Sequence, residues 1–182
     1  SAPPRIVCFD LGGVLVRICR SWEEGCRAAG IDIRVDSDLA SGDPSRLTLV
    51  HDLEVGAISP EQFFRTIAEG MQNLYSPEEI ERVHHAWILG EYPGVADLIG
   101  ELRTGPATLA CLSNTNAPHW EQMRGFASLD ALHHRFASHE LACRKPDEQI
   151  FRAFEDRLEA RPREILFFDD THANIAGALE AG

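Results

Sequence analysis

Ile6-Val7-Cys8-Phe9-Asp10-Leu11-Gly12-Gly13-Val14-Leu15 is the stretch that decides the fold. Four apolar residues run into a single aspartate, which is typical of a short buried strand. Asp10 then stands at the carboxyl end of that strand, where open α/β sheets bind their ligands. The two glycines allow the backbone to turn sharply after it. Taken alone, the stretch also fits a strand that ends in an ordinary turn, so the rest of the chain has to decide.

The middle of the chain has a helical pattern, from about residue 21 to residue 85. Ser21, Ser59 and Ser76 each begin a helix-start signal, and we expect no further strand here after Leu15. The second half alternates instead. Apolar runs at 107–112, 134–139 and 164–168 predict strands, and the segments at 93–102, 146–158 and 174–181 predict helices. Such alternation predicts an α/β fold with a parallel sheet, interrupted after its first strand by a small α-helical insert.

Composition excludes several classes of partner. The chain has 182 residues and a formal net charge of −12, so its surface should repel nucleic acid and anionic membranes. No apolar run is long enough to span a bilayer. The cysteines are odd in number and form no CxxC pair, which predicts reduced thiols and a cytoplasmic location. The sequence stops directly after a helical pattern, and we expect one or two final strands to be missing.

Chemically useful side chains gather where the predicted strands end. Asp10, Ser113 and the pair Asp169-Asp170 each follow an apolar run, so a parallel sheet brings them to one edge. Three neighbouring carboxylates repel one another, and Mg²⁺ prefers such oxygens together with water and a phosphate group. Lys145 adds a positive charge, and the helix that opens near Thr115 offers backbone N–H groups to an anion. This set suits phosphoryl transfer through an aspartyl-phosphate.

Four segments in order resemble the motifs of the haloacid dehalogenase (HAD) superfamily of phosphohydrolases. They are Phe9-Asp10-Leu11-Gly12-Gly13-Val14-Leu15, Leu112-Ser113-Asn114-Thr115-Asn116, Arg144-Lys145-Pro146-Asp147, and Phe167-Phe168-Asp169-Asp170 with Asn174 after it. The amino-acid sequences of the first two motifs and of residues 56–59 are similar to those of one branch of the family, the bacterial sugar-phosphate phosphatases such as glucose-1-phosphatase. The resemblance implies a Rossmann-like core, residues 1–16 and 92–182, and a helical cap domain, residues 17–91.

The resemblance also implies roles for single residues in the reaction. Asp10 corresponds to the nucleophile, and Lys145 corresponds to the lysine that balances charge on the nucleophile and the phosphate. Ser113 and Asn114 correspond to residues that contact the phosphate, with Ser113 counted among the catalytic residues. The implied substrate is a small phosphorylated metabolite, with a sugar phosphate as one candidate, and the implied assembly is a monomer or a weak homodimer.

The implied Mg²⁺ ligands are Asp10, the backbone carbonyl of Gly12, Asp169 and Asp170. For Asp170, a water-holding role and a partnership with Lys145 stay open. One position departs from the family pattern, because most phosphatases of the family carry an aspartate as general acid and base where this chain has Gly12. The main hypothesis is therefore a magnesium-dependent phosphatase. The alternatives are a binding or regulatory protein with weak turnover and, ranked lower, a haloacid dehalogenase, which would not need the acidic pair.

Several other side chains have a functional and a structural interpretation. His119 is a candidate replacement acid, although a structural hydrogen bond is favoured. The pairs His84-His85 and His133-His134 are expected to pack or to face solvent rather than to chelate a metal. Arg17 and Arg20 are candidates for the mouth of the phosphate site. The aromatic residues that could line a pocket in the cap are Trp22, Phe63, Phe64 and Trp87.

Overall fold

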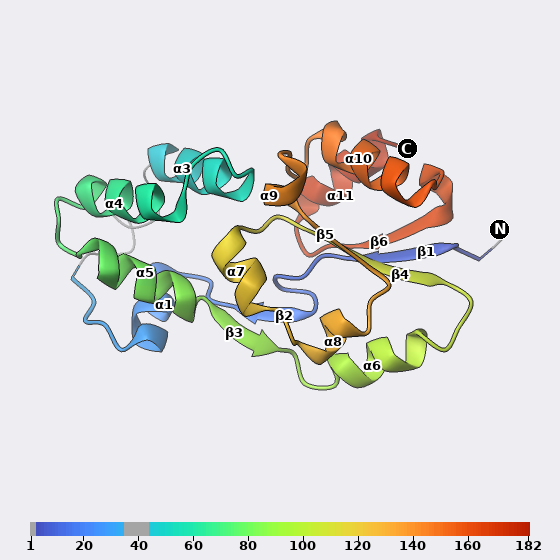
Figure 1. Ribbon diagram of the computed structural model, residues 1–182, viewed down its shortest axis with the longest axis horizontal. Helices are drawn as coiled ribbons and strands as arrows, with labels where there is room; N and C mark the ends of the chain where they lie inside the picture. The colour runs from blue at the N-terminus through green and yellow to red at the C-terminus, as the bar shows by residue number, and fades with distance from the viewer. Residues whose placement is uncertain (1–2, 35–43) are drawn as a thin grey trace.

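A four-stranded parallel sheet forms the centre of the molecule (Figure 1). The computed structural model describes residues 3–34 and 44–182. The strand order is β5-β4-β1-β6, so the first strand of the chain lies inside the sheet, between β4 and β6. The direction of strand addition changes at β1, which makes its carboxyl end the expected ligand-binding position. The strands are β1 (Ile6–Phe9), β4 (Thr108–Ser113), β5 (His134–Ala137) and β6 (Ile165–Phe168).

Helices cover both faces of this sheet and make it a three-layer α/β fold, as the sequence predicts. On β4, Leu109 and Cys111 join the core on one face, and Ala110 and Leu112 join the core on the other. Burial on both sides explains why the strands are continuous apolar runs rather than alternating ones. One face is covered by α6 (Val95–Leu102), α7 (Ala117–Gln122) and α8 (Ala127–Asp130); the other is covered by α10 (Glu148–Leu158) and α11 (His172–Glu180). The short helices are α9 (Ser138–Leu141) and η1 (Pro162–Glu164).

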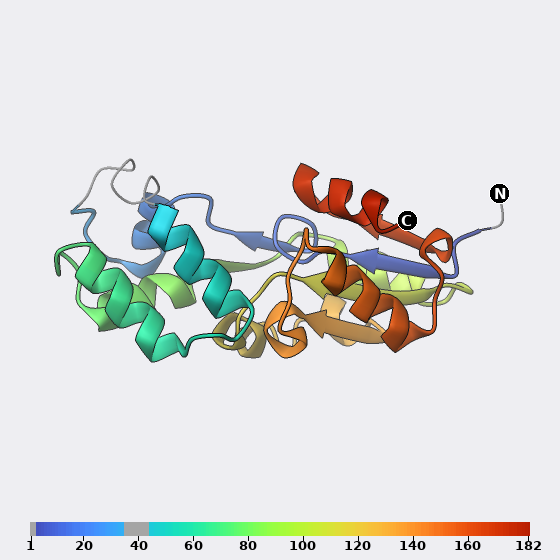
Figure 2. The ribbon, with the colours of Figure 1, turned by 90° about the horizontal axis from the view of Figure 1, so that it is seen from above.

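Four further helices form a module beside the sheet (Figure 2). This module has a hydrophobic core of its own. They are α1 (Trp22–Ala29), α3 (Pro44–Glu54), α4 (Pro60–Gly70) and α5 (Pro77–Ala86). The helix starts follow the sequence signals, because Ser21, Ser59 and Ser76 each accept a hydrogen bond from the backbone three residues on. The polar segment at residues 32–44, for which the sequence predicts a loop or a frayed short helix, lies mostly outside the described residues. We call α1, α3, α4 and α5 the helical module.

The expectation that no strand follows Leu15 before the second half is wrong. Strand β2 (Val16–Ile18) pairs antiparallel with β3 (Ile88–Glu91), and Arg17 donates across the ribbon to the Leu89 carbonyl at 3.3 Å. Strands this short show no readable alternation, and each is ordered by pairing with the other. The two chain segments that join the helical module to the sheet thus run side by side. The division at residues 16/17 and 91/92 into core and cap remains a proposal, and this ribbon lies at that boundary.

A stacked pair of histidines joins the helical module to α7. The rings of His84 and His119 lie 3.8 Å apart between centroids and are nearly parallel, at 9°. His119 Nε2 donates to the His84 carbonyl at 2.7 Å and His119 Nδ1 accepts from Asn116 Nδ2, which fixes His119 as a neutral imidazole, while His84 Nε2 donates to Asn116 Oδ1. Burial lowers the pKa of His84 well below its usual value and lowers that of His119 to about 4.

This pair predicts a loss of stability in mild acid. The unfolded chain protonates each imidazole below a pH of about 6.5, whereas folded His119 resists protonation until about 4. The free energy of unfolding should therefore fall as pH falls through this window, by about 1.4 kcal/mol per pH unit for each imidazole. Urea unfolding at several pH values measures the slope. The variant His119→Gln should show a shallower slope, and an equal slope in both proteins would contradict the assignment.

No helix in the described ranges is long and apolar enough to cross a bilayer. The longest of them, such as α3 and α10, have 11 residues.

Candidate active site

Asp10 lies at the carboxyl edge of the sheet, directly after β1. Its backbone N–H donates to the Phe168 carbonyl at 2.8 Å, which continues the pairing of β1 with β6. The register therefore sets Asp169 and Asp170 beside Asp10. Oxygens of these three carboxylates lie within 4.8 Å of one another, and in the described part of the chain they form the single group able to hold a metal ion. The convergence predicted from the strand ends is thus present for these three residues.

Lys145 lies between two of these carboxylates. Its Nζ is 2.9 Å from Asp10 Oδ1 and 2.6 Å from Asp169 Oδ2, and its side chain has no solvent exposure. The Asn114 side chain positions it, since Asn114 Oδ1 accepts from the Lys145 N–H and Asn114 Nδ2 donates to the Lys145 carbonyl, both at 2.8 Å. The direct phosphate contact expected for Asn114 remains a prediction. In the structure its amide holds the backbone of Lys145.

Tight packing of α11 holds the turn that carries Lys145. A Cβ atom at Gly177 would lie 2.3 Å from the Pro146 carbonyl oxygen, so only glycine lets α11 approach this closely. Asp169 is fixed from the same side. It accepts from the Thr171 N–H at 2.8 Å and from Asn174 Nδ2 at 3.0 Å. Asn174 has a sequence signal only through the fourth motif, and the structure shows its contact.

Arg20 reaches the acidic group from the connection between β2 and the helical module. Its Nη2 lies 3.1 Å from Asp170 Oδ2, so Asp170 pairs with Arg20, while Lys145 pairs with the other two carboxylates. The suggested partnership of Asp170 with Lys145 is therefore not what the structure shows. Gly13, with φ of +82°, leaves room for this contact, because a Cβ there would lie 2.2 Å from Asp170 Oδ2.

The electrostatics of the edge favour a bound cation. Burial raises the pKa of Asp10, and the charge of Asp169 raises it further, while Lys145 acts in the opposite direction. Lys145 and Arg20 together supply two positive charges, which do not compensate all three carboxylates. Clustered carboxylate oxygens are the donors that Mg²⁺ prefers, so the three residues fit this ion, and the ligand roles of Asp10, Asp169 and Asp170 remain predictions. A ligand role for the Gly12 carbonyl remains a prediction.

One expectation about the anion site needs correction, and the structural hydrogen bond favoured for His119 is confirmed. Ser113 lies buried at the end of β4, as expected, but the Thr115 N–H is not available to an anion, because it donates to Ser138 Oγ at 2.9 Å. His119 is a weak candidate for the missing acid, because its Nε2–H is bonded to the His84 carbonyl and its pKa is low. At Gly12, a Cβ would lie 3.2 Å from Ile18 Cδ1, so the place of the usual acid has an apolar neighbour.

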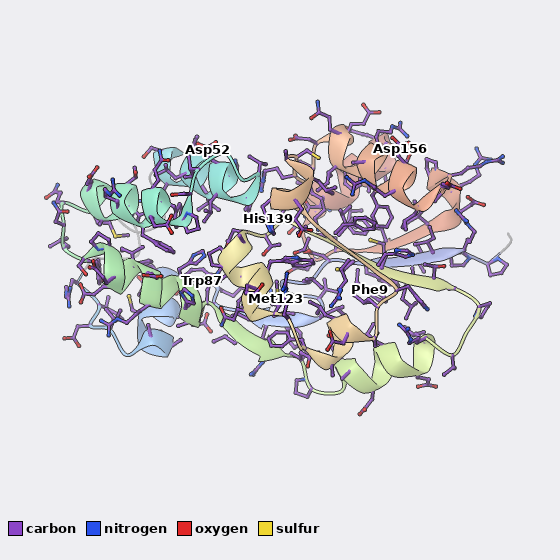
Figure 3. The ribbon with its side chains drawn as sticks, viewed as in Figure 1. Phe9, Asp52, Trp87, Met123, His139 and Asp156 are labelled. Atoms are coloured by element: carbon purple, nitrogen blue, oxygen red, sulfur yellow. The ribbon has the colours of Figure 1, made fainter. Side chains whose placement is uncertain are left out.

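The helical module contacts the loop that carries Lys145, and the sequence gives no signal of this contact. Arg144 Nε lies 2.9 Å from Glu54 Oε2, and Ser138 Oγ donates to the Glu54 carbonyl at 2.6 Å. These partners are 84 and 90 positions apart, so no local pattern reveals them. Figure 3 places His139 and Trp87 where the helical module meets the rest of the molecule.

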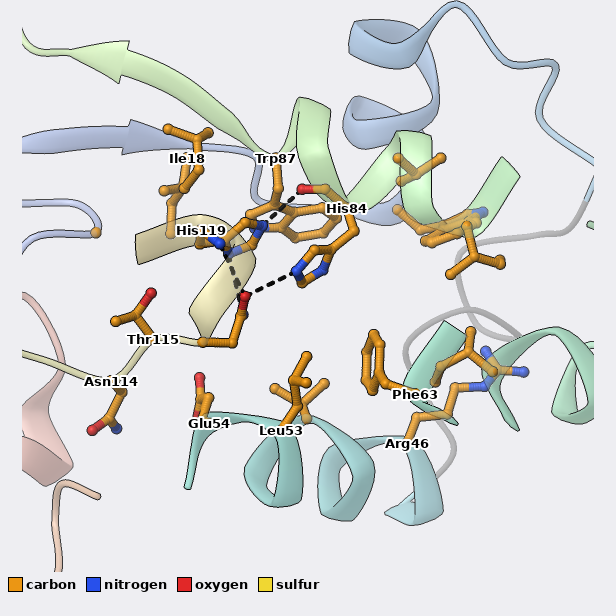
Figure 4. Close-up of a pocket in the computed structure, with 18 of the residues that line it drawn as sticks. Ile18, Arg46, Leu53, Glu54, Phe63, His84, Trp87, Asn114, Thr115 and His119 are labelled. Carbon is orange, nitrogen blue, oxygen red and sulfur yellow. Dashed lines mark hydrogen bonds between the residues drawn. The ribbon is translucent and has the colours of Figure 1, made fainter. Parts of the chain in front are cut away.

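A cavity of about 450 Å³ opens between the helical module and the carboxyl edge of the sheet around Asp10, which we call the catalytic edge (Figure 4). Gly12, Ser113 and Asn114 line its end at the edge of the sheet. Of the aromatic residues proposed for a cap pocket, Trp22, Phe63 and Trp87 line it and Phe64 does not.

Residues 4–182 match the haloacid dehalogenase-like hydrolase family. The chain belongs to this family. Among solved structures, the HAD family enzyme bt-2542 from Bacteroides thetaiotaomicron, in its magnesium complex, is 26% identical with a TM-score of 0.80, and the match covers 100% of this chain and 91% of that one. The same enzyme is also known in complex with magnesium and inorganic phosphate. A HAD-like family hydrolase from Porphyromonas gingivalis is 28% identical with a TM-score of 0.79, covering 100% and 89%.

A curated relative is named as a dehalogenase. The (S)-2-haloacid dehalogenase 1 of a Pseudomonas strain is 32% identical over 94 residues. This match covers 50% of the present chain and 40% of the dehalogenase, so the chain matches about two fifths of that protein's length.

The acidic group predicts that Mg²⁺ stabilises the protein. An ion that binds only the folded chain raises its melting temperature by mass action. The intact protein should therefore melt at a higher temperature in MgCl₂ than in an equal ionic strength of NaCl. Asp169→Ala removes a ligand and should abolish most of this difference. The exposed Asp156 provides the control Asp156→Ala, which should keep it; an unchanged melting temperature in the intact protein would contradict the metal site.

Proposed function

We propose that this chain is a magnesium-dependent phosphoric monoester hydrolase that acts on a small phosphorylated metabolite. The observation that carries the proposal is Lys145, held without solvent between Asp10 and Asp169 at the carboxyl edge of the sheet. This arrangement compensates charge on a nucleophile and on an incoming phosphate at once. The magnesium and inorganic phosphate complex of the Bacteroides enzyme supports it.

In the proposed reaction, one carboxylate oxygen of Asp10 attacks the phosphorus of the ester. A new P–O bond forms to Asp10 as the ester P–O bond breaks, and the leaving oxygen departs with the electron pair and takes a proton from water. Water then attacks the same phosphorus, which releases inorganic phosphate and restores the Asp10 carboxylate. Lys145 stabilises the charge on Asp10 and the phosphoryl oxygens in both steps. Bound Mg²⁺ supplies further charge neutralisation and orients the phosphate.

The dehalogenase relative makes haloacid dehalogenation the second candidate. That reaction uses an aspartate nucleophile but has no need of a metal, so the Asp169-Asp170 pair beside Asp10 disfavours it. A binding or regulatory role is the third candidate, motivated by Gly12. Release of chloride from 2-chloropropionate, measured beside hydrolysis of 4-nitrophenyl phosphate with and without Mg²⁺, separates the three. The phosphatase proposal requires the second activity, requires it to depend on Mg²⁺, and requires chloride release to be absent.

Asp10→Asn should remove nearly all phosphatase activity and leave the fold intact, because an amide neither attacks phosphorus nor binds Mg²⁺ well. Hydrolysis of 4-nitrophenyl phosphate measures the loss, and the circular dichroism spectrum checks the fold. The control is Asp156→Asn on α10, which should retain activity. Substantial turnover by purified Asp10→Asn would overturn the covalent mechanism.

Gly12 predicts a preference for good leaving groups. A positioned general acid typically contributes about 10²–10⁴-fold, and its absence matters most when the leaving alcohol is weakly acidic. Aryl phosphates, acyl phosphates and sugar 1-phosphates should therefore react faster than esters of primary alcohols. A steep dependence of the phosphorylation rate on leaving-group pKa is expected. Because His119 is engaged with His84, His119→Gln should leave this dependence unchanged. A flat dependence in the intact enzyme, with phosphorylation rate-limiting, would show that another acid acts.

A further inference from the structure

The cavity beside the catalytic edge has an apolar wall. Its size, about 450 Å³, lies in the range of small-molecule sites. A large part of its wall comes from the helical module and includes six buried aliphatic, aromatic and thioether side chains (Figure 4). These residues are Leu53, Phe63, Ile67, Met71, Ile80 and Val83.

Packing alone does not account for a space of this kind. Protein interiors are close-packed, and apolar side chains around a void lose dispersion contacts that they would otherwise make. The space is continuous with the catalytic edge, since Gly12, Ser113 and Asn114 line it as well. A phosphate group at Asp10 would therefore direct the rest of its ester into the cavity. The occupant that fits this position is the leaving group of the substrate.

Most of the polar side chains on the wall are already engaged with other protein groups. Glu54 is paired with Arg144, and Arg20 is paired with Asp170. The amide groups of Asn114 and Asn116 and the rings of His84 and His119 are bonded to each other or to backbone. A sugar would bury several hydroxyl groups here with few partners, and buried polar groups without partners are costly.

The wall also includes a buried donor that has no partner. The indole N–H of Trp22 has no hydrogen-bond acceptor among the described residues, and Trp22 lines the cavity. Its ring is held edge-on against Tyr75, with centroids 5.2 Å apart. This single donor could pair with one oxygen of a sugar, whose other hydroxyl groups and own O–H donors would still lack partners.

We propose that the substrate is an aryl phosphate or an apolar acyl phosphate rather than a phosphorylated sugar. Its apolar body occupies the cavity beside the catalytic edge. The inference rests on the proposed function and narrows it to a substrate class. The same class also meets the requirement set by Gly12, because phenols and carboxylic acids leave without a positioned acid.

The first test compares two esters that differ in one group. In 3-ethylphenyl phosphate and 3-(hydroxymethyl)phenyl phosphate the leaving phenols have similar size and acidity, but one carries a methyl group where the other carries a hydroxyl. With Mg²⁺, the intact protein should show a kcat/KM at least about tenfold higher for the ethyl compound. Equal values, or a preference for the hydroxymethyl compound, would overturn the inference and leave the phosphatase proposal standing.

The second test measures binding without turnover. Ligand-observed NMR should show that 3-ethylphenol binds the intact protein more tightly than 3-(hydroxymethyl)phenol. Val50 lines the cavity from α3 and is 36% exposed, so Val50→Trp can fill the space from its rim and should weaken binding. The control is Leu98→Trp on α6, at an exposed position that does not line the cavity.

The combined outcomes separate the two proposals. Hydrolysis of both esters without binding of 3-ethylphenol, or binding that Val50→Trp and Leu98→Trp affect equally, would overturn the assignment of the cavity. Binding of 3-ethylphenol that only Val50→Trp weakens, with neither ester hydrolysed in Mg²⁺, would overturn the proposed function and with it the substrate class.

Discussion

The buried contact of Lys145 with Asp10 and Asp169 is the interaction on which the rest of the site depends. Two carboxylates this close and this buried are tolerated because a cation lies between them. Removing one partner of a buried ion pair typically costs about 3–5 kcal/mol, since the remaining charge stays uncompensated. Much of the surrounding structure serves to hold this ammonium group in place. Asn114 clamps its backbone, and Gly177 lets α11 pack against the turn that follows it.

The same constraint links the catalytic edge to the helical module. Arg20 extends from the end of the β2–β3 ribbon to Asp170, and Glu54 at the end of α3 holds Arg144, the neighbour of Lys145. Both contacts join residues of the module, or of its connection, to residues at the site. The module also supplies the apolar wall of the cavity that opens on Gly12 and Ser113. Charge is thus concentrated at the sheet edge, and apolar surface is concentrated above it.

Sequence predicted those parts of the site that follow from strand ends. Asp10, Asp169 and Asp170 each come directly after an apolar run, and a parallel sheet has to bring such ends to one edge. The same reasoning could not find β2 and β3, because strands of three and four residues form only by pairing with each other. It also could not find the ion pair between Glu54 and Arg144, because this contact joins distant segments. For the same reason it could not show that the Thr115 N–H is bonded to Ser138, or that His119 Nε2 is bonded to the His84 carbonyl.

The central claim is that phosphate becomes covalently attached to Asp10. Acetyl phosphate tests it most directly, because its good leaving group makes the first step fast and lets the attached form accumulate. Rapid acid quenching during turnover in Mg²⁺, followed by peptide mass spectrometry, should show phosphate on the peptide that contains Asp10, and hydroxylamine should remove it. Turnover of acetyl phosphate with Asp10 unmodified at every quench time, or with phosphate on another residue, would contradict the claim.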